Sequence, residues 1–505
     1  MGITSIARFY FHKRQKELER HGKEGVQMQA EVLKSLLERA SDTEYGRDHI
    51  FNMTRSYEEF AHNVPVNTYE ELKGDIDRMR HGEKDILWPG IVKWYAKSSG
   101  TTNDKSKFIP VSDEGLQNIH YQGGNDAVAM YLQNNPKSRL FDGKSLILGG
   151  SHSSNYNVDG SLVGDLSAIL IENINPIVNL VRVPDKRTAL ISDFEVKRDK
   201  IAEICLHKNV TNISGVPSWM MSVLQRVMEL SGKQHLEEVW PNLEVFFHGG
   251  IAFTPYRKAY EQLITSPNMH YMETYNASEG FFGLQNDPED KSMLLMLDYD
   301  VFYEFIPMDE FGKENPTVVP LEGVKVGINY AMIISTSCGL WRYLIGDTVR
   351  FTSRNPYKFV ITGRTKHFIN AFGEELIIDN AEKGLQYACK KHGAQVREYT
   401  AAPVFRDEHT IPHHQWVIEF SCPPDDVEAF ADTLDAKLQE LNSDYEAKRY
   451  KDINMVRLKI VVAEDGLFER WMRKRGKLGG QNKVPRLSNS REHIDELLKM
   501  NAYNG

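Results

Sequence analysis

Short apolar runs alternate with longer segments of helical periodicity between residues 141 and 349. This alternation limits the possible folds more than any other feature of the chain. Runs such as residues 145–148 and 242–247 predict strands, and the periodic segments at 216–230 and 255–264 predict helices between them. Because strands that alternate with helices are typical of α/β domains, the sequence predicts a large α/β domain with several sheets or one large sheet.

The pattern changes after Gly363 and Arg364, and residues 366–505 predict a smaller α+β unit. Helices are expected near residues 379–392, 425–441, 467–474 and 491–500, and strands near residues 396–405, 415–421 and 455–463. A chain of 505 residues is too long for one compact core. We therefore expect an N-terminal domain over residues 1–363 and a C-terminal domain over residues 364–505. The first forty residues are expected to be mainly one amphipathic helix.

Composition excludes several classes of function. The net charge of −9 provides no basic field, so a nucleic-acid partner is not expected. No segment reaches the roughly 18 uncharged apolar residues of a membrane span, and no membrane partner is expected. The four cysteines lie far apart, without a C-x-x-C pair, which favours reduced thiols over a disulfide framework or zinc site. These features predict a soluble, cytoplasmic protein.

A loop of small hydroxyl-bearing residues stands between two apolar runs that begin at Ile91 and Phe108, which predicts a strand, a loop and a strand. The loop contains Ser98, Ser99, Gly100, Thr101 and Thr102. Its many backbone N–H groups and hydroxyls suit contact with phosphate oxygens. It is not a P-loop, because no second glycine precedes Lys-Ser/Thr and no helix follows. Taken alone, the segment fits a solvated hairpin loop equally well.

Three other segments each allow a functional and a structural interpretation. Glu279, just after a strand that ends near Thr274, is either a ligand for Mg²⁺ or a solvated turn residue. Asp347 follows Gly346 between two apolar runs, so it either binds the hydroxyls of a ribose or forms the turn of a hairpin. Gly249 and Gly250 mark either a close backbone approach to a flat ligand or a tight turn.

A glycine-rich basic loop near the C-terminus contains Lys483. A lysine in such a loop is a flexible point charge that suits a phosphate group. An ordinary basic surface loop is the structural alternative.

Taken in order, these motifs resemble those of the acyl-adenylating enzymes: acyl-CoA synthetases, adenylation domains of peptide synthetases and luciferases. The residues within these motifs are more similar to those of the plant acyl acid amido synthetases of the Gretchen Hagen type, which conjugate auxin, jasmonate or benzoates to amino acids. The particular matches are Ser98–Thr102 with Lys-x-Ile-Pro downstream, Val216-Pro217-Ser218-Trp219, Ser278-Glu279-Gly280, and Asn482 to Arg486.

The resemblance implies a large domain and a small mobile lid domain that bind ATP, Mg²⁺ and an acyl acid between them. By similarity, Ser98, Ser99, Gly100, Thr101 and Thr102 would cradle the phosphates. Gly249 and Gly250 would flank the adenine, Tyr275 would stack near it, and Ser278 would also contact the nucleotide. Glu279 would hold Mg²⁺, Asp347 with Arg364 would bind the ribose, and Lys483 would reach the α-phosphate and the acyl oxygens. The hinge would lie at Lys366 or its neighbours, although the common Gly-Arg-x-Asp spelling is absent here.

The function implied is an ATP- and Mg²⁺-dependent ligase. It would activate a carboxylic acid as an acyl-adenylate, release pyrophosphate, and transfer the acyl group to an amino acid. The alternatives are an acyl-CoA ligase with the same first step and a nucleotide-binding protein without turnover. Val216, Trp219 and Met220 are candidate walls of the acyl pocket by similarity, but packing within a helix core explains them equally well.

Overall fold

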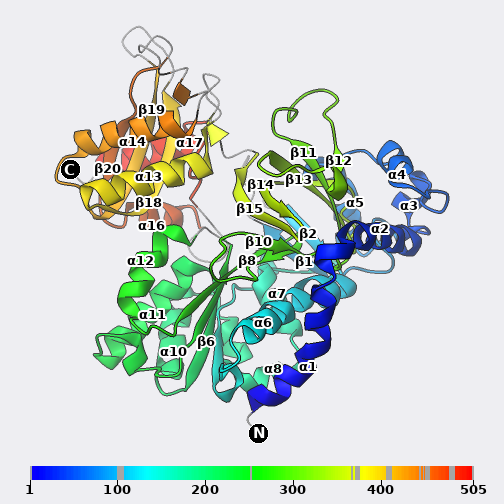
Figure 1. The fold of residues 1–505 in the computed structure, drawn as a ribbon, viewed down its shortest axis with the longest axis horizontal. Helices are drawn as coiled ribbons and strands as arrows, with labels where there is room; N and C mark the ends of the chain where they lie inside the picture. Colours follow the sequence, from blue (N-terminus) through cyan, green and yellow to red (C-terminus); the bar gives the residue numbers. More distant parts are fainter. Residues whose placement is uncertain are drawn as a thin grey trace. The chain divides into compact units, whose positions relative to one another are not determined.

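The computed structural model describes residues 3–98, 107–250, 253–365, 368–369, 376–404, 412–442, 445–446, 449, 455–476, 484–488 and 490–502. The chain divides into two compact units. The first holds residues 1–345 and 350–360, and the second holds residues 346–349, 361–478 and 482–505. The predicted combination of a large α/β unit with a smaller α+β unit is confirmed (Figure 1). Residues 346–349 and 361–363 belong to the second unit, although the expected domain boundary places them in the N-terminal domain.

The first unit is built on a twelve-stranded sheet with the order β12-β11-β13-β14-β15-β10-β9-β8-β7-β6-β3-β5. Strands β5, β3, β6, β7 and β8 are parallel neighbours, and β8, β9, β10 and β15 pair antiparallel. A second sheet has the order β2-β1-β4. The strands are β1 (Trp94–Ser98), β2 (Lys107–Val111), β3 (Lys144–Ile147), β4 (Leu162–Gly164), β5 (Arg182–Val183), β6 (Val210–Gly215), β7 (Val245–Gly249), β8 (His270–Ala277), β9 (Gly280–Leu284), β10 (Met293–Leu295), β11 (Val301–Pro307), β12 (Val319–Pro320), β13 (Asn329–Thr336), β14 (Tyr343–Arg354) and β15 (Tyr357–Arg364).

Helices cover both faces of the parallel part of this sheet (Figure 1). Phe246 and Phe247 are consecutive in β7 and therefore point to opposite faces. Phe246 packs in a core with residues of α10, α11 and α12, and Phe247 packs with residues of α1 and α6. The helices are α1 (Ile3–Leu18), α2 (His21–Ala40), α3 (Glu44–Asp48), α4 (Tyr57–Asn63), α5 (Tyr69–Arg80), α6 (Gln122–Asn134), α7 (Leu166–Asn173), α8 (Pro176–Val181), α9 (Lys186–Ala189), α10 (Phe194–Leu206), α11 (Pro217–Ser231) and α12 (Thr254–Leu263), with short helical turns at Gly115–Tyr121, Leu140–Asp142, Ser154–Tyr156, Leu236–Glu238 and Leu321–Gly323.

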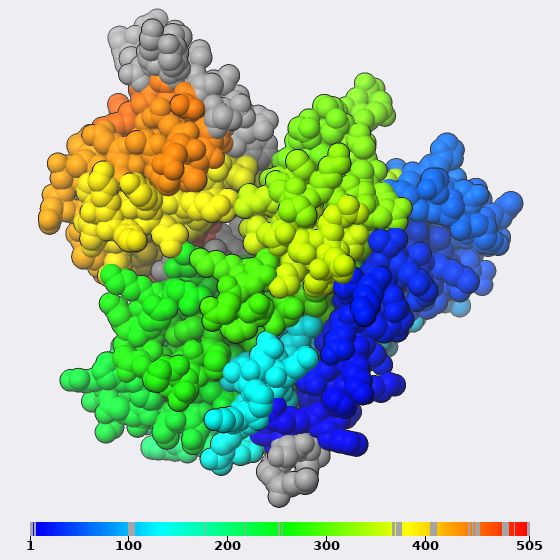
Figure 2. All heavy atoms as spheres, in the orientation of Figure 1, coloured from blue at the N-terminus to red at the C-terminus, as the bar shows by residue number. Residues whose placement is uncertain are grey.

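The N-terminal residues form two helices, α1 and α2, where one was expected. Helix α1 lies along α6, as the blue and cyan surfaces in Figure 2 show, and α2 packs against β11. Arg14 of α1 donates hydrogen bonds to both oxygens of Asp126 in α6, at 3.0 Å each from Nε, and to Asp298 at 2.6 Å from Nη1. The buried Tyr299 hydroxyl also donates to Asp126, at 2.5 Å, and His21 Nε2 lies 3.3 Å from Asp298. This group, the Arg14 cluster, fixes the N-terminal helices to the unit.

The second unit contains a three-stranded sheet with the order β18-β19-β20 and a two-stranded ribbon, β16-β17. Neighbouring residues again serve two cores. Trp416 packs with α13 and α14, and Val417 packs with α16 and α17. The elements are β16 (Phe368–Ile369), β17 (Leu376–Ile377), α13 (Ile378–His392), β18 (Gln395–Val404), β19 (His413–Cys422), α14 (Val427–Leu441), β20 (Lys459–Ala463), α16 (Leu467–Lys474) and α17 (Glu492–Ala502). The predicted helices and strands of this region are confirmed with small shifts of their ends.

Among the helices of the described residues, none has both the length and the apolar composition that a membrane span requires.

Candidate functional site

Three parallel strands of the first unit end side by side. In the register of the sheet, Gly215 of β6 lies beside His248 of β7, and Gly249 lies beside Thr274 of β8. Val216 directly follows β6, and Ser278 and Glu279 directly follow β8. In α/β sheets, ligands bind outside the carboxyl ends of the parallel strands. The structure therefore brings several of the predicted site residues to the edge where a ligand is expected.

Gly249 and Gly250 are required by the local geometry. A side-chain carbon at Gly249 would lie 2.5 Å from the carbonyl oxygen of Thr274, so the close approach here is to the backbone of β8. Gly250 has a φ of +82°, which few other residues adopt. A side-chain carbon there would also lie 3.3 Å from Val216. The geometry agrees with the tight turn that the sequence offered as one alternative, and the close approach of these glycines to a flat ligand stays a prediction.

Glu279 occupies the turn between β8 and β9, beside Ser278. Its interpretation as a solvated turn residue is wrong, because Glu279 is only 6% exposed and Ser278 only 4%. A carboxylate at a strand end is normally hydrated, and burying it is costly without compensating partners. Glu279 is therefore a buried carboxylate at the carboxyl end of β8.

Tyr275 lies in the sheet one residue before the irregular pairing of β8 with β9. Its ring packs edge-on against Phe282 with a centroid distance of 5.0 Å, and it also contacts Phe359. Tyr275 is buried. This packing leaves little ring surface for stacking on an adenine, the role that the resemblance gives to Tyr275.

The two strands predicted on either side of the loop that follows Ser98 are confirmed. Strands β1 and β2 pair antiparallel from Trp94 with Val111 to Ser98 with Lys107, so Ser98 and Lys107 form the base of the loop. Ser99, Gly100, Thr101 and Thr102 lie outside the described residues.

Lys107 is a candidate to which the sequence assigned no role. Its Nζ lies 3.4 Å from the Tyr343 hydroxyl and faces the rings of Tyr69 and Tyr343. The Lys-x-Ile-Pro motif contained the signal, because Lys107 is its first residue. The contacts place a positive charge at the base of the loop that follows Ser98.

The hairpin expected at Gly346 and Asp347 is wrong. Residues Tyr343–Arg354 form the single strand β14, and the chain reverses at Asn355 and Pro356 instead. Gly346 has a φ of +89°, so the strand bends at this point without turning back.

Asp347, just after this bend, forms an ion pair with Arg364 at the end of β15, with 2.6 Å between Arg364 Nε and Asp347 Oδ1. The two side chains that the resemblance assigned to the ribose are thus in direct contact. The guanidinium fixes the position of the carboxylate, which is 11% exposed.

The three residues proposed for the acyl pocket differ in burial. Met220 is fully buried in the core that α11 shares with β6 and β7, which agrees with the packing interpretation. Val216 and Trp219 keep part of their surface exposed, and Trp219 packs edge-on against Phe194 at 4.9 Å. Of the three, Val216 and Trp219 have surface that a ligand can reach.

Lys197 is a second candidate that the sequence did not reveal. It lies in α10, is 4% exposed, and donates hydrogen bonds to the carbonyl oxygens of Gly149 and Gly150 beyond the end of β3. Burial lowers the pKa of Lys197 to about 8, partly opposed by the charge of Asp165. No sequence signal could have found it, because it belongs to a run of charged residues that resembles a solvated helix face.

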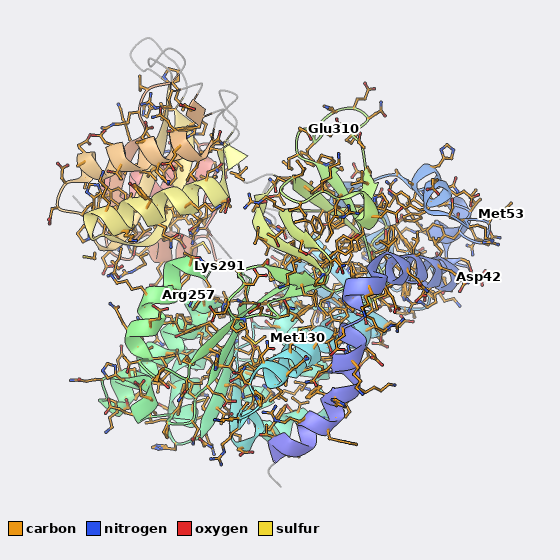
Figure 3. The ribbon with its side chains drawn as sticks, in the orientation of Figure 1. Asp42, Met53, Met130, Arg257, Lys291 and Glu310 are labelled. Carbon is orange, nitrogen blue, oxygen red and sulfur yellow. The ribbon has the colours of Figure 1, made fainter. Side chains whose placement is uncertain are left out.

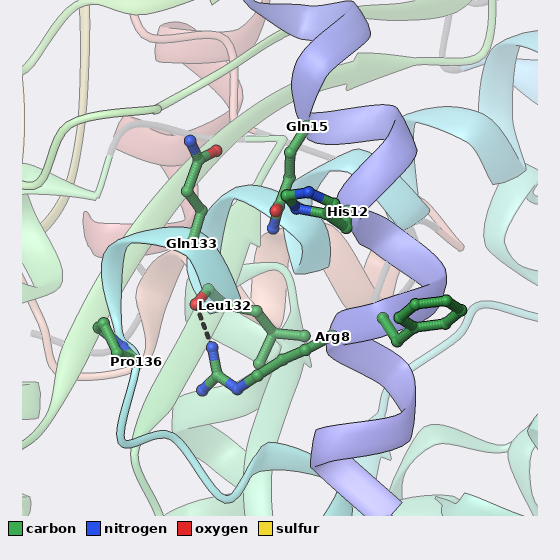
Figure 4. A pocket seen from close by; sticks show the side chains of 7 residues that line it. Arg8, His12, Gln15, Leu132, Gln133 and Pro136 are labelled. Atoms are coloured by element: carbon green, nitrogen blue, oxygen red, sulfur yellow. Dashed lines mark hydrogen bonds between the residues drawn. The ribbon is translucent and has the colours of Figure 1, made fainter.

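A hollow of about 390 Å³ lies elsewhere, between α1 and the end of α6 (Figure 4). It is lined by Arg8, Phe9, His12, Gln15, Leu132, Gln133 and Pro136. None of these is a predicted site residue. On the opposite face of the sheet, Arg257 of α12 lies over the rings of Phe253 and Tyr271 (Figure 3).

Lys366 and Lys483, the residues predicted for the hinge and for the α-phosphate, lie outside the described residues.

Known proteins similar to this chain include plant enzymes. Indole-3-acetic acid-amido synthetase GH3.4 of Arabidopsis thaliana is 25% identical over 541 residues, covering 91% of this chain and 88% of the relative. The structure of the acyl acid amido synthetase AtGH3.15 in complex with 2,4-DB matches with a TM-score of 0.80 at 21% identity, covering 96% of this chain and 95% of that one. The structure of 2-hydroxyisobutyryl-CoA ligase in complex with 2-HIB-AMP has the same fold, with a TM-score of 0.60 at 12% identity, covering 94% and 91%.

Models of three domains match consecutive parts of the sequence. They are the GH3 family N-terminal domain over residues 14–269, the GH3 family central domain over residues 294–364 and the GH3 family C-terminal domain over residues 379–492. The resemblance to acyl acid amido synthetases is therefore confirmed, and the chain belongs to the GH3 family.

Proposed function

We propose that this protein is a ligase that activates a carboxylic acid with ATP and joins it to the amine of an amino acid. Membership of the GH3 family supports this function, as does the similarity to an indole-3-acetic acid-amido synthetase. The observation that carries the proposal is the position of the buried Glu279 beside the carboxyl ends of β6, β7 and β8. A nucleotide bound at this edge would meet a carboxylate that the fold has removed from water.

In the first step, an oxygen of the substrate carboxylate attacks the α-phosphorus of ATP, and the bond from that phosphorus to the pyrophosphate oxygen breaks. Two anions approach one another in this step, so positive charge at the reacting groups lowers the barrier. Lys483 supplies this charge in the proposal, and the loop from Ser98 to Thr102, with Lys107 at its base, holds the phosphates. Asp347, held by Arg364, accepts hydrogen bonds from the ribose hydroxyls.

Glu279 fits the requirements for one ligand of Mg²⁺. Mg²⁺ usually binds one or two protein carboxylates and takes its other ligands from water and substrate phosphates. Among the described residues, no group of three or more His, Cys, Asp or Glu side chains could hold a metal by itself. A single buried carboxylate beside a bound triphosphate agrees with that pattern. When bound, the ion would neutralise charge on the phosphate oxygens.

In the second step, the neutral amine nitrogen attacks the acyl carbon of the adenylate, and the bond from that carbon to the phosphate oxygen breaks. An amide bond forms, AMP leaves, and the proton lost by the nitrogen is released to the medium. The mixed anhydride is already reactive, so the protein mainly has to align the amine and exclude water. Val216 and Trp219 are the candidate contacts for the acyl group, because both keep exposed surface at the start of α11.

The test is a screen for pyrophosphate release with a panel of carboxylic acids, crossed with amino acids and with coenzyme A as acceptors. We expect pyrophosphate and AMP, and a product mass equal to acid plus amino acid minus water. A thioester with coenzyme A would instead support the acyl-CoA ligase. Binding of ATP without turnover would support a nucleotide-binding protein, and release of ADP and phosphate would contradict adenylation.

The variant Glu279→Gln keeps the size of the side chain and removes its charge. We expect pyrophosphate release to fall about 100-fold or more, with a weaker dependence on Mg²⁺ concentration. Glu289→Gln, in the exposed loop after β9, is the matched control and should retain activity. Full activity of Glu279→Gln at low Mg²⁺ would remove the metal assignment.

A further inference from the structure

The segment that follows the Lys483 loop is bound to the edge of β18. The backbone N–H of Ala401 donates to the carbonyl of Arg486 at 2.8 Å, and the N–H of Ser488 donates to the carbonyl of Ala401 at 3.1 Å. The hydroxyl of Thr400 donates to the carbonyl of Pro485 at 2.6 Å. Leu487, which pairs in parallel with Ala401, is fully buried. The backbone is therefore fixed from Pro485 onward.

The side chain of Arg486 fixes the same segment a second time. Its Nη1 donates to Glu382 Oε1 of α13 at 2.6 Å, and its Nη2 lies 3.0 Å from Glu398 Oε1 of β18. The guanidinium carbon lies 4.7 Å from the centre of the Tyr399 ring, and the Tyr399 hydroxyl donates to Glu382 at 2.9 Å. We call Arg486, Glu382, Glu398 and Tyr399 the Arg486 cluster. It joins a helix, a strand and the Lys483 segment.

This arrangement requires an arginine. Two carboxylates from different elements and the face of an aromatic ring are contacted by one planar, forked cation. A lysine would preserve the charge, but its single ammonium group cannot contact both carboxylates and stack on Tyr399 in the same way. All three charged side chains are less than one-fifth exposed, so the cluster is largely shielded from solvent.

We propose that Arg486 is a positioning residue for Lys483 and so for the adenylation step. The inference rests on the proposed function, because that function gives Lys483 its role. Only three peptide links separate the two residues, and an extended chain gains at most about 3.6 Å per residue. A fixed Arg486 therefore restricts where the Lys483 ammonium can reach. Displacing a reacting group by 1 Å can cost about 100-fold in rate.

The experiment measures the two half-reactions separately in the full chain. Adenylation is followed by pyrophosphate release with the best acid from the screen. Acyl transfer is followed by the reaction of the prepared acyl-adenylate of that acid with the amino acid. For Arg486→Met we expect adenylation to fall about 100-fold through kcat, with little change in KM for ATP. Acyl transfer should stay within threefold of the wild type. The adenylation rate of Arg486→Lys should lie between the rates of the wild type and of Arg486→Met.

Arg491→Met is the matched control. Arg491 also ties the C-terminal segment to the sheet, through the carbonyl of Pro403 and the side chain of Gln415, and it pairs with Asp495. We expect it to leave both half-reactions within threefold. Equal loss of both steps in Arg486→Met and Arg486→Lys would overturn the positioning role, as would the same split in Arg491→Met. If wild-type protein released no pyrophosphate, or if Lys483→Ala left adenylation intact, the proposed function itself would fail.

Discussion

The Arg14 cluster of the first unit and the Arg486 cluster of the second both contain an arginine between two carboxylates and a tyrosine hydroxyl, and the Arg14 cluster also contains His21. They fix different kinds of structure. Arg14 joins helix α1 to helix α6, and also to Asp298 in the short connection between strands β10 and β11. Arg486 joins α13 and β18 to a segment that belongs to neither a helix nor one of the strands of the sheet. The same chemistry joins elements of the scaffold in one unit and holds the segment from Pro485 to Ser488 against α13 and β18 in the other.

The carboxylates of the two clusters also differ in proton affinity. Burial by itself would raise the pKa of Asp298, but hydrogen bonds from His21 and Arg14, with their charges, hold it well below its usual range. Burial raises the pKa of Glu398 above its usual range, and the charge of Arg486 opposes this shift only in part. Compensation is therefore more complete in the Arg14 cluster. The difference follows from the number of donors, because two side chains, Arg14 and His21, donate to Asp298, whereas Glu398 shares Arg486 with Glu382.

The largest effect is expected from Arg14→Met. It leaves the fully buried Asp126 without its cation, and breaking a buried pair in this way costs about 3 kcal/mol or more. Native-state hydrogen exchange of the α6 amides measures the loss. The control is Arg20→Met, which removes an exposed pair with Glu24 and should leave exchange unchanged. Equal effects of the two variants would show that the Arg14 cluster contributes no more than a surface pair.

A smaller effect is expected from Arg486→Met on the stability of the second unit. The free energy of unfolding should fall by about 2 kcal/mol, which lies between the losses expected for breaking a buried and an exposed ion pair. Adding Glu398→Gln should then restore about 1 kcal/mol, because a carboxylate left without its cation is removed. Exchange of the α13 and β18 amides provides the measurement. Additive losses in the double variant would indicate that Arg486 and Glu398 do not interact.

The smallest of these expected effects is the change in folding stability with pH. Because the pKa of Glu398 is raised in the folded state, the folded protein binds more protons than the unfolded chain just above the ordinary pKa of a glutamate. The stability that Glu398 contributes is therefore fully present below that ordinary pKa and is lost as the pH rises through the raised value. Asp298 has the opposite sign, and its contribution is lost as the pH falls through its lowered pKa.

The difference in stability between wild type and Glu398→Gln, followed by unfolding from pH 4 to pH 7, checks this sign. The wild type should lose stability relative to the variant as the pH rises. If the wild type instead gained stability relative to the variant, the charge of Arg486 would have a larger effect on the pKa of Glu398 than burial has. The carboxylates of both clusters would then have lowered pKa values.

Sequence patterns predicted the elements of this fold well where periodicity is local. The helix expected near residues 379–392 is α13 (Ile378–His392), and the strand expected to end near Thr274 lies within β8. They failed where the outcome depends on distant partners. Gly346 and Asp347 have the composition of a turn, but the neighbours of β14 in the sheet keep it extended.

The site was predictable in part for the same reason. Asp347 and Arg364 are 17 positions apart, and their pairing was expected only through family resemblance before the contact appeared in the structure. The burial of Glu279 and Lys197 could not be predicted, because burial depends on how β8, β9 and α10 pack and not on the neighbouring residues in the sequence. For the same reason the Arg486 cluster gave no sequence signal: its members lie on α13, on β18 and in the C-terminal segment.

The hydrogen bonds from Ala401 and Ser488 have a consequence for solubility. In the sheet order β18-β19-β20, β18 is an outer strand with a row of backbone groups facing away from β19. Exposed strand edges of this kind can pair with another chain and start aggregation. The segment from Pro485 to Ser488 occupies that row at Ala401. A substitution that releases this segment should therefore expose the unpaired backbone groups of the β18 edge, and the variant should aggregate more readily than the wild type.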